Sequence, residues 1–429
     1  MSGHSHSGDF DKNKTLGILP IFMFLLASSF YFYEFFLQIS PGVMTQELMR
    51  DLGINAAALG TISAFYYYSY TAFQIPAGLL YDRFGARKIM SLALLVCSTG
   101  ALLFGLTNIP GFAAAGRLLM GAGSAFAFVG TLYLILHWFP SRYFPVFAGL
   151  TQFMGSAGAL GGNAPLAKLT AHFGWHQVIL TMAIIGFVLT FIIFSLVRND
   201  PKQCQKIERS SKSKSMWHNL LFVLKTPQTW PIAIYSCLIW APVAAFAGLW
   251  GVPFLAAKYG IDTFHAAKLI MWIWVGVGLG APFIGWVSQK IGRRCLPNST
   301  AAFLGVFSTA LIIYSPCPAW VACILLFLFG VASTGQSLSF AIITDIQPVS
   351  TASAGIGFNN MAVVAGAIFF QPLIGKILDA HWTGQMINGA RYYDHQAYAS
   401  ALVALPICYG ICWLVNVFFV RETYCEKKI

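Results

Sequence analysis

Charged side chains are scarce in this 429-residue chain, where Asp, Glu, Lys and Arg together make up only 9% of the residues. A soluble protein of this length needs far more charged surface, whereas 57% of these residues are hydrophobic. The low charge therefore excludes an ordinary soluble protein and indicates a membrane protein. The net charge of +12 does not indicate a nucleic-acid partner, because the basic residues lie in short loops and form no single face or stripe.

The chain also lacks a cluster of cysteines or histidines with metal-ligand spacing. Its nine cysteines are scattered, mostly within apolar stretches, where we interpret them as small packing residues. His4 and His6 in the N-terminal tail are too few for a metal-binding tract. No nucleophile and base stand at catalytic spacing. We therefore expect no metal, no cofactor and no enzymatic activity.

Long apolar runs fill most of the chain, and each needs about 20 residues to cross a bilayer. The first run is too long for a signal-peptide core and no small-residue cleavage site follows it, so it should remain as a helix. Breaks at Pro, Gly and charge clusters predict twelve transmembrane helices, at about 17–40, 55–81, 89–108, 111–138, 145–168, 176–197, 229–257, 264–289, 298–316, 319–346, 352–378 and 397–420.

The longest polar interruption separates two groups of six helices, so we predict an all-α membrane protein made of two six-helix bundles. The predicted parts are a tail (1–16), a first bundle (17–197), a linker (198–228), a second bundle (229–420) and a second tail (421–429). If the N-terminus is cytoplasmic, 19 of the 26 Lys and Arg residues lie on the cytoplasmic side, and six lie outside. Because basic residues concentrate in cytoplasmic loops, both termini are predicted to be cytoplasmic.

Glu34 and Arg117 are opposite charges inside predicted spans. Charges are costly in hydrocarbon, so such residues usually face a protein interior or a water-filled path. Each lies about six residues from the same predicted side of the membrane, Glu34 in the first span and Arg117 in the fourth. We expect the two to meet. Glu34 would carry a coupling proton, while Arg117 would hold it or receive an anionic substrate group; the alternative is a static ion pair that locks the two helices together.

The two halves are weakly similar to each other. The segment Gly78–Arg87, which follows the second span, has an echo in Gly285–Arg294, which follows the eighth. A Pro-to-Gly spacing of nine also occurs in both halves, from Pro140 to Gly149 and from Pro348 to Gly357. Parallel six-helix repeats are a known transporter design, with the substrate site near the midplane between them.

The first of these loops resembles the signature loop of the major facilitator superfamily, and the resemblance extends over all twelve spans. It is carried by Gly78, Asp82, Arg83, Gly85 and Arg87, with an arginine motif around Arg117 on the fourth helix. The family's loop is thought to hold the halves together in the outward-open state, and the alternative is a basic loop that only sets topology. The second copy has Gln289 in place of the acidic residue, which puts a similar role there in doubt.

The resemblance implies a path lined by the first, fourth, seventh and tenth helices, with the third, sixth, ninth and twelfth facing lipid. Polar and aromatic residues on the predicted helices are the candidates for the substrate cavity, and for each the alternative is interhelical packing or hydrogen bonding. Besides the Glu34 and Arg117 pair, these candidates are Tyr31, Gln38, Tyr66, Tyr70, Tyr133, Gln152, Trp240, Trp274, Gln336, Asn359 and Asn360.

The function implied is secondary active transport, proton-coupled and inward, by a monomer in the bacterial inner membrane. A weaker resemblance, in Tyr70–Gly78 and the Glu34 and Arg117 pair, is to bacterial phagosomal-transporter-type nutrient carriers and lysosomal dipeptide carriers. An acid, a base and aromatic rings favour a zwitterion, so amino acids, short peptides or nucleosides are the expected substrates. The alternatives are proton-driven efflux of a drug or siderophore and, from another class, a non-transporting receptor or scaffold.

Overall fold

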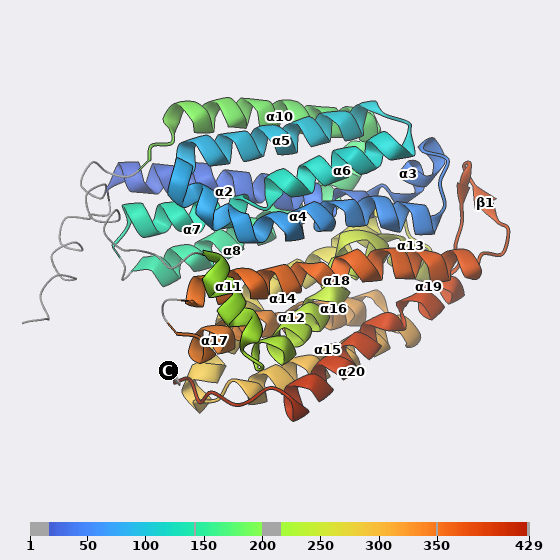
Figure 1. Cartoon of the computed structure of the whole chain (residues 1–429). Coiled ribbons are helices and arrows are strands. Elements are labelled where there is room, and N and C mark those ends of the chain that lie inside the picture. The colour runs from blue at the N-terminus through green and yellow to red at the C-terminus, as the bar shows by residue number, and fades with distance from the viewer. Residues whose placement is uncertain (1–16, 141–142, 200–215, 349–350, 427–429) are drawn as a thin grey trace, which may run out of the picture.

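The computed structural model describes residues 17–140, 143–199, 216–348 and 351–426. Within them the chain is almost entirely helical, and it folds into two groups of helices that lie side by side (Figure 1). The described segments before and after residue 200 form separate groups in this view, and the predicted domain bounds stay a prediction. The start of α2 and the C-terminal segment lie at one end of the bundle, which we call the terminal end, and a short hairpin lies at the opposite end.

Ten helical segments in the described part of the first half pack together. They are α2 (Ile18–Ile39), η1 (Ser40–Val43), α3 (Thr45–Asp51), α4 (Ala56–Phe84), α5 (Ala86–Leu106), α6 (Pro110–Ser124), α7 (Ala127–Trp138), α8 (Phe144–Gly161), α9 (Ala164–Phe173) and α10 (Trp175–Leu196). Of these, α6 with α7 occupies the predicted fourth span, and α8 with α9 the fifth.

The second half repeats this arrangement and adds the hairpin. Its elements are α11 (Met216–Lys225), α12 (Thr229–Ala245), the π-helical turn η5 (Phe246–Trp250), α13 (Gly251–Tyr259), α14 (Thr263–Ile291), α15 (Cys295–Tyr314), α16 (Ala319–Ser333), α17 (Gly335–Ile346), α18 (Ala352–Ala380), β1 (Met386–Ile387), β2 (Ala390–Arg391), α19 (His395–Leu402) and α20 (Ala404–Phe418). Pro242 lies inside α12, and the π-helical turn follows it, so the predicted seventh span is not a regular helix.

Ten segments in the described part of the chain are long and apolar enough to cross a membrane. Two more of the predicted spans, α4 and α8 with α9, are helical but fall outside this set. These helices pack among the others. Because only ten segments meet the criteria of length and apolar composition, twelve crossings stay a prediction, and so does the cytoplasmic position of the termini. On α10, Phe191 and Ile184 are 71% and 61% exposed, as expected of the sixth helix against lipid.

The predicted linker contains one described helix. Its stretch 200–215 lies outside the described residues, but α11 follows within its predicted bounds. Leu220 and Val223 of α11 are buried and pack in one apolar cluster with Ala233 and Phe358. The linker therefore contains a helix whose buried face packs against the second half, and its bounds stay a prediction.

Contacts between the halves are concentrated along α4 and α18, and at the end away from the termini. Gly60 of α4 lies so close to α18 that a Cβ there would stand 2.5 Å from the carbonyl oxygen of Gln371. Asp379, near the end of α18, accepts hydrogen bonds from the backbone N–H groups of Ala56 and Ala57 at 3.3 and 2.8 Å. These contacts close the bundle at this end.

Candidate functional site

A cavity lies between the halves, and four helices of each half line it. Its lining residues are Tyr31, Glu34, Phe35, Gln38, Tyr70, Phe128, Gln152, Ser156, Trp240, Trp274, Val277, Gln336, Phe340, Asn360, Val363 and Val364. The helices expected to line a path, here α2, α7, α12 and α17, all contribute. The lining set takes nothing from α5, α10, α15 or α20, which correspond to the helices expected to face lipid.

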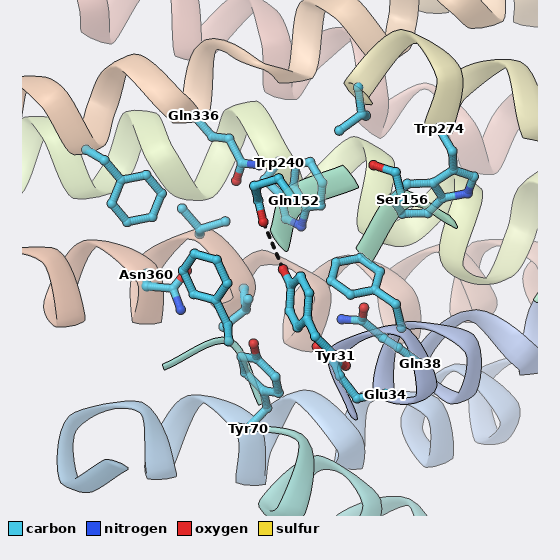
Figure 2. A pocket seen from close by; sticks show the side chains of 16 residues that line it. Tyr31, Glu34, Gln38, Tyr70, Gln152, Ser156, Trp240, Trp274, Gln336 and Asn360 are labelled. Atoms are coloured by element: carbon cyan, nitrogen blue, oxygen red, sulfur yellow. Dashed lines mark hydrogen bonds between the residues drawn. The ribbon is translucent and has the colours of Figure 1, made fainter. Parts of the chain in front are cut away.

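Nine of the predicted residues line this cavity: Tyr31, Glu34, Gln38, Tyr70, Gln152, Trp240, Trp274, Gln336 and Asn360. Figure 2 shows these side chains converging from opposite halves. The Tyr31 hydroxyl donates to the Gln152 side-chain oxygen at 3.0 Å, which joins α2 to α8. Asn360 donates to Gln74 at 2.8 Å, which joins the two halves beside the cavity.

Three predicted cavity residues, Tyr66, Tyr133 and Asn359, are absent from the lining and are corrected. Tyr133 stacks against Tyr81, with ring centroids 5.6 Å apart, and is not among the lining residues. Asn359 is fully buried, accepts from Ser236 at 2.7 Å and donates to Ser339 at 2.9 Å, so it joins α12, α17 and α18. An amide within the membrane needs partners, and for Asn359 neighbouring helices supply them in place of the cavity.

Glu34 lines the cavity with one carboxylate oxygen bonded and one unpartnered. The Tyr66 hydroxyl donates to its Oε2 at 2.7 Å. Its Oε1 is buried and has no hydrogen-bond partner, and the residue as a whole is 1% exposed. A buried carboxylate oxygen without a hydrogen-bond partner is costly, so Oε1 is an unsatisfied acceptor at the cavity.

Arg117 does not form the predicted ion pair with Glu34, although both lie in the described part of the chain. Its two terminal nitrogens donate to the backbone carbonyls of Leu37 and Gln38, at 3.0 and 3.2 Å, in the last turn of α2. Its guanidinium also lies over the Tyr66 ring, 4.7 Å from the centroid. The last carbonyls of a helix have no partner within it and carry partial negative charge, so they attract this cation.

Tyr66 therefore stands between the two charges that the sequence singles out. Its hydroxyl holds the carboxylate, and its ring face holds the guanidinium. Tyr70, one turn later on α4, stacks on it with ring centroids 5.9 Å apart and itself lines the cavity. The i, i+4 spacing predicts this shared face, but only Tyr70 reaches the cavity.

The signature loop joins α4 to α5 at the terminal end. Gly85 has φ +77°, a conformation that residues with a Cβ rarely adopt. Arg87 lies over the ring of Phe194, 4.7 Å from its centroid, and its backbone N–H donates to Asn199 at 3.0 Å. Arg83 and Asp82 are exposed, and Gly78 has open space around it. These contacts of Arg87 lie within the first half, so a role in holding the two halves together stays a prediction.

Seven lining residues were not predicted: Phe35, Phe128, Ser156, Val277, Phe340, Val363 and Val364. Six are apolar and carry no polarity signal in an apolar helix. Ser156 lies in a glycine-rich segment of α8, where Gly158 packs against the backbone of Phe32. One face of that segment packs on α2 while Ser156 lines the cavity.

Comparison with known proteins agrees with this architecture. A family model described as Major Facilitator Superfamily matches residues 22–371. The probable galactarate/D-glucarate transporter GudP of Bacillus subtilis (strain 168) is 26% identical, with 91% of each chain covered. Among solved structures, an inward-facing, occupied bacterial homologue of the human lysosomal transporter Spinster has a TM-score of 0.74 at 15% identity, covering 95% of this chain and 98% of that one.

The structure of a D-xylose-proton symporter is also similar, with a TM-score of 0.71 at 14% identity, covering 95% of this chain and 99% of that one. At these identities the solved structures support the fold alone. The family model, in contrast, covers most of the chain. This protein therefore belongs to the Major Facilitator Superfamily and is a membrane transporter.

Proposed function

We propose that this protein is a proton-coupled secondary transporter that imports a small polar solute by alternating access. The observation that carries the proposal is Glu34, a buried carboxylate that lines a cavity between the halves and has one unpartnered oxygen. A carboxylate in such a site binds and releases a proton as its surroundings change. The bacterial relatives support a place in the inner membrane, where a proton gradient is available.

The mechanism rests on contacts that join the halves and would have to break in each cycle. Asp379 holds α18 to the start of α4, and Asn360 holds α18 to Gln74 beside the cavity. When the halves rock, Glu34 meets water from one side and then from the other, and it exchanges its proton at Oε1. The Tyr66 hydroxyl stabilises the carboxylate in its deprotonated form.

The structure removes the basis for predicting a zwitterionic substrate. It rested on Arg117 giving the cavity a positive charge, whereas the guanidinium binds the end of α2. The cavity therefore does not favour amino acids and peptides over other small polar solutes as substrates. The name of the GudP relative suggests a second candidate, the transport of a sugar diacid.

The test uses purified protein in liposomes that contain a pH-sensitive dye. Galactarate, D-xylose, uridine and alanyl-alanine are added one at a time, and substrate-dependent acidification of the interior is measured. We expect one of them to move protons with the wild type. Glu34→Gln should abolish the proton signal while exchange of radiolabelled solute across the membrane continues. Proton movement that survives in Glu34→Gln would refute the role of this residue.

A further inference from the structure

The charge of the cavity constrains what it binds. Glu34 is the one lining residue with a carboxylate, and none of the lining residues, all of them in the described part of the chain, is Lys, Arg or His. The guanidinium of Arg117 is turned to Leu37, Gln38 and the Tyr66 ring. A buried anion in this cavity would lose its hydration with no cation there to compensate, and it would face a like charge whenever Glu34 is deprotonated.

The polar groups around the cavity include both donors and acceptors that the protein leaves unsatisfied. Glu34 Oε1 and Trp274 Nε1 are buried without a hydrogen-bond partner. Gln336 also lines the cavity, and its side chain makes no hydrogen bond within the described structure. Buried polar groups are normally hydrogen-bonded, so unsatisfied donors and acceptors at one site indicate a ligand that supplies the complementary groups.

The apolar part of the lining is largely aromatic. Trp240 and Trp274 meet edge to face with ring centroids 6.4 Å apart, and Phe35 lies against Trp274 at 6.0 Å. Tyr31 packs on Phe35 at 5.1 Å. Rings of this kind cover the flat apolar face of a ligand whose edges carry polar groups.

We infer that the substrate has no net negative charge, presents several hydroxyl or amide groups, and has a face that packs on aromatic rings. This inference rests on the proposed transport function and narrows it. Neutral sugars, nucleosides and short peptides share this chemistry. Sugar diacids, for which the GudP relative is named, do not.

The test measures binding to the purified full-length protein in detergent, through the melting temperature at increasing concentrations of each solute. A ligand that binds the folded state raises the melting temperature. D-xylose, uridine and alanyl-alanine distinguish the three sources of the chemistry, and galactarate represents the diacids. We expect at least one of the first three to stabilise the protein by a few degrees and galactarate to have no effect.

Two variants locate the binding. Gln336→Leu removes an unpaired amide from the cavity, so it should weaken the stabilisation about tenfold in ligand concentration, as the loss of one good hydrogen bond implies. Asn219→Leu, on α11 and outside the cavity lining, should leave it unchanged. Stabilisation by galactarate, or none by the three other solutes, would overturn the inference.

The two proposals fail separately. Galactarate-driven proton movement that depends on Glu34 would refute the substrate class and keep the coupling role. Binding of an uncharged solute, with proton movement unaffected by Glu34→Gln, would support the substrate class and refute the coupling role of Glu34.

Discussion

The carboxylate of Asp379 accepts a hydrogen bond from the backbone N–H of Ala57 at 2.8 Å, and this bond joins the second half of the protein to the first. The neighbouring N–H of Ala56 donates to the same carboxylate. Both N–H groups belong to the first turn of α4, where they have no partner within the helix and where negative charge is favourable. Arg391 and Tyr393 also bind Asp379, so the hairpin segment contributes to the same contact.

Replacement of Asp379 by Asn should weaken this contact between the halves. An amide carries no charge and offers one acceptor oxygen, so about 1–3 kcal/mol of charge-assisted bonding is at stake. Hydrogen–deuterium exchange of a peptide covering residues 56–61 should become roughly tenfold faster or more. Asp262→Asn is the matched control, because Asp262 caps α14 within its own half. If Asp262→Asn speeds exchange at residues 56–61 as much as Asp379→Asn does, the contact of Asp379 between the halves does not protect this peptide.

A methyl group at Gly60 should act on the same contact sterically. The Cβ of Gly60→Ala would stand 2.5 Å from the Gln371 carbonyl oxygen of the other half, so α4 and α18 have to separate. We expect faster exchange at both helices and a shift toward opening at the end away from the termini. Gly149→Ala on α8, which has open space around it, is the control for helix propensity. Unchanged exchange in Gly60→Ala would mean that the helices adjust locally.

The bond between Tyr66 and Glu34 predicts strong coupling between these positions. Tyr66→Phe removes the donor at 2.7 Å and leaves the ring under Arg117, so the carboxylate keeps no partner. The expected loss is about 1–3 kcal/mol of stability. In the Glu34→Gln background, Tyr66→Phe should lower the free energy of unfolding much less, because no charged acceptor is left buried. Unfolding of the four proteins in a double-mutant cycle measures the difference, and additive losses would contradict the contact.

The C-terminal segment should respond to acid. Burial raises the pKa of Glu422. Its carboxylate accepts hydrogen bonds from the backbone N–H groups of Arg294, Cys295, Thr423 and Tyr424, which lower the pKa by more than burial raises it. The pKa of Glu422 therefore lies below the ordinary value. A lowered folded-state pKa gives stability above the unfolded pKa of about 4.3 that is lost as the pH falls through the folded value.

We therefore expect the melting temperature to fall on acidification below about pH 4.5, and to fall less steeply in Glu422→Gln. The variant should be less stable than the wild type at neutral pH, because its amide is a weaker acceptor. Parallel curves for the two proteins would assign the acid sensitivity to other carboxylates.

Helical spacing in the sequence was enough to find much of the cavity. Glu34 and Gln38 are four residues apart and share one face of α2 with Tyr31, and all three line the cavity. A polar side chain within an apolar helix is a second local signal, and it identifies Gln152, Gln336 and Asn360. It cannot find Phe35 or Val363, because apolar residues in an apolar helix look the same whether they face a ligand, another helix or lipid.

The sequence by itself determined that the chain is an apolar helical protein in two halves, because scarce charge and long hydrophobic runs leave no other way to satisfy its backbone. Tertiary structure alone decided how the intramembrane charges are used. Glu34 and Arg117 come to the same region, but Tyr66 stands between them, and the last carbonyls of α2 bind the guanidinium. A sequence does not predict this interaction, because it depends on which side chain lies beside the end of the helix in the folded protein.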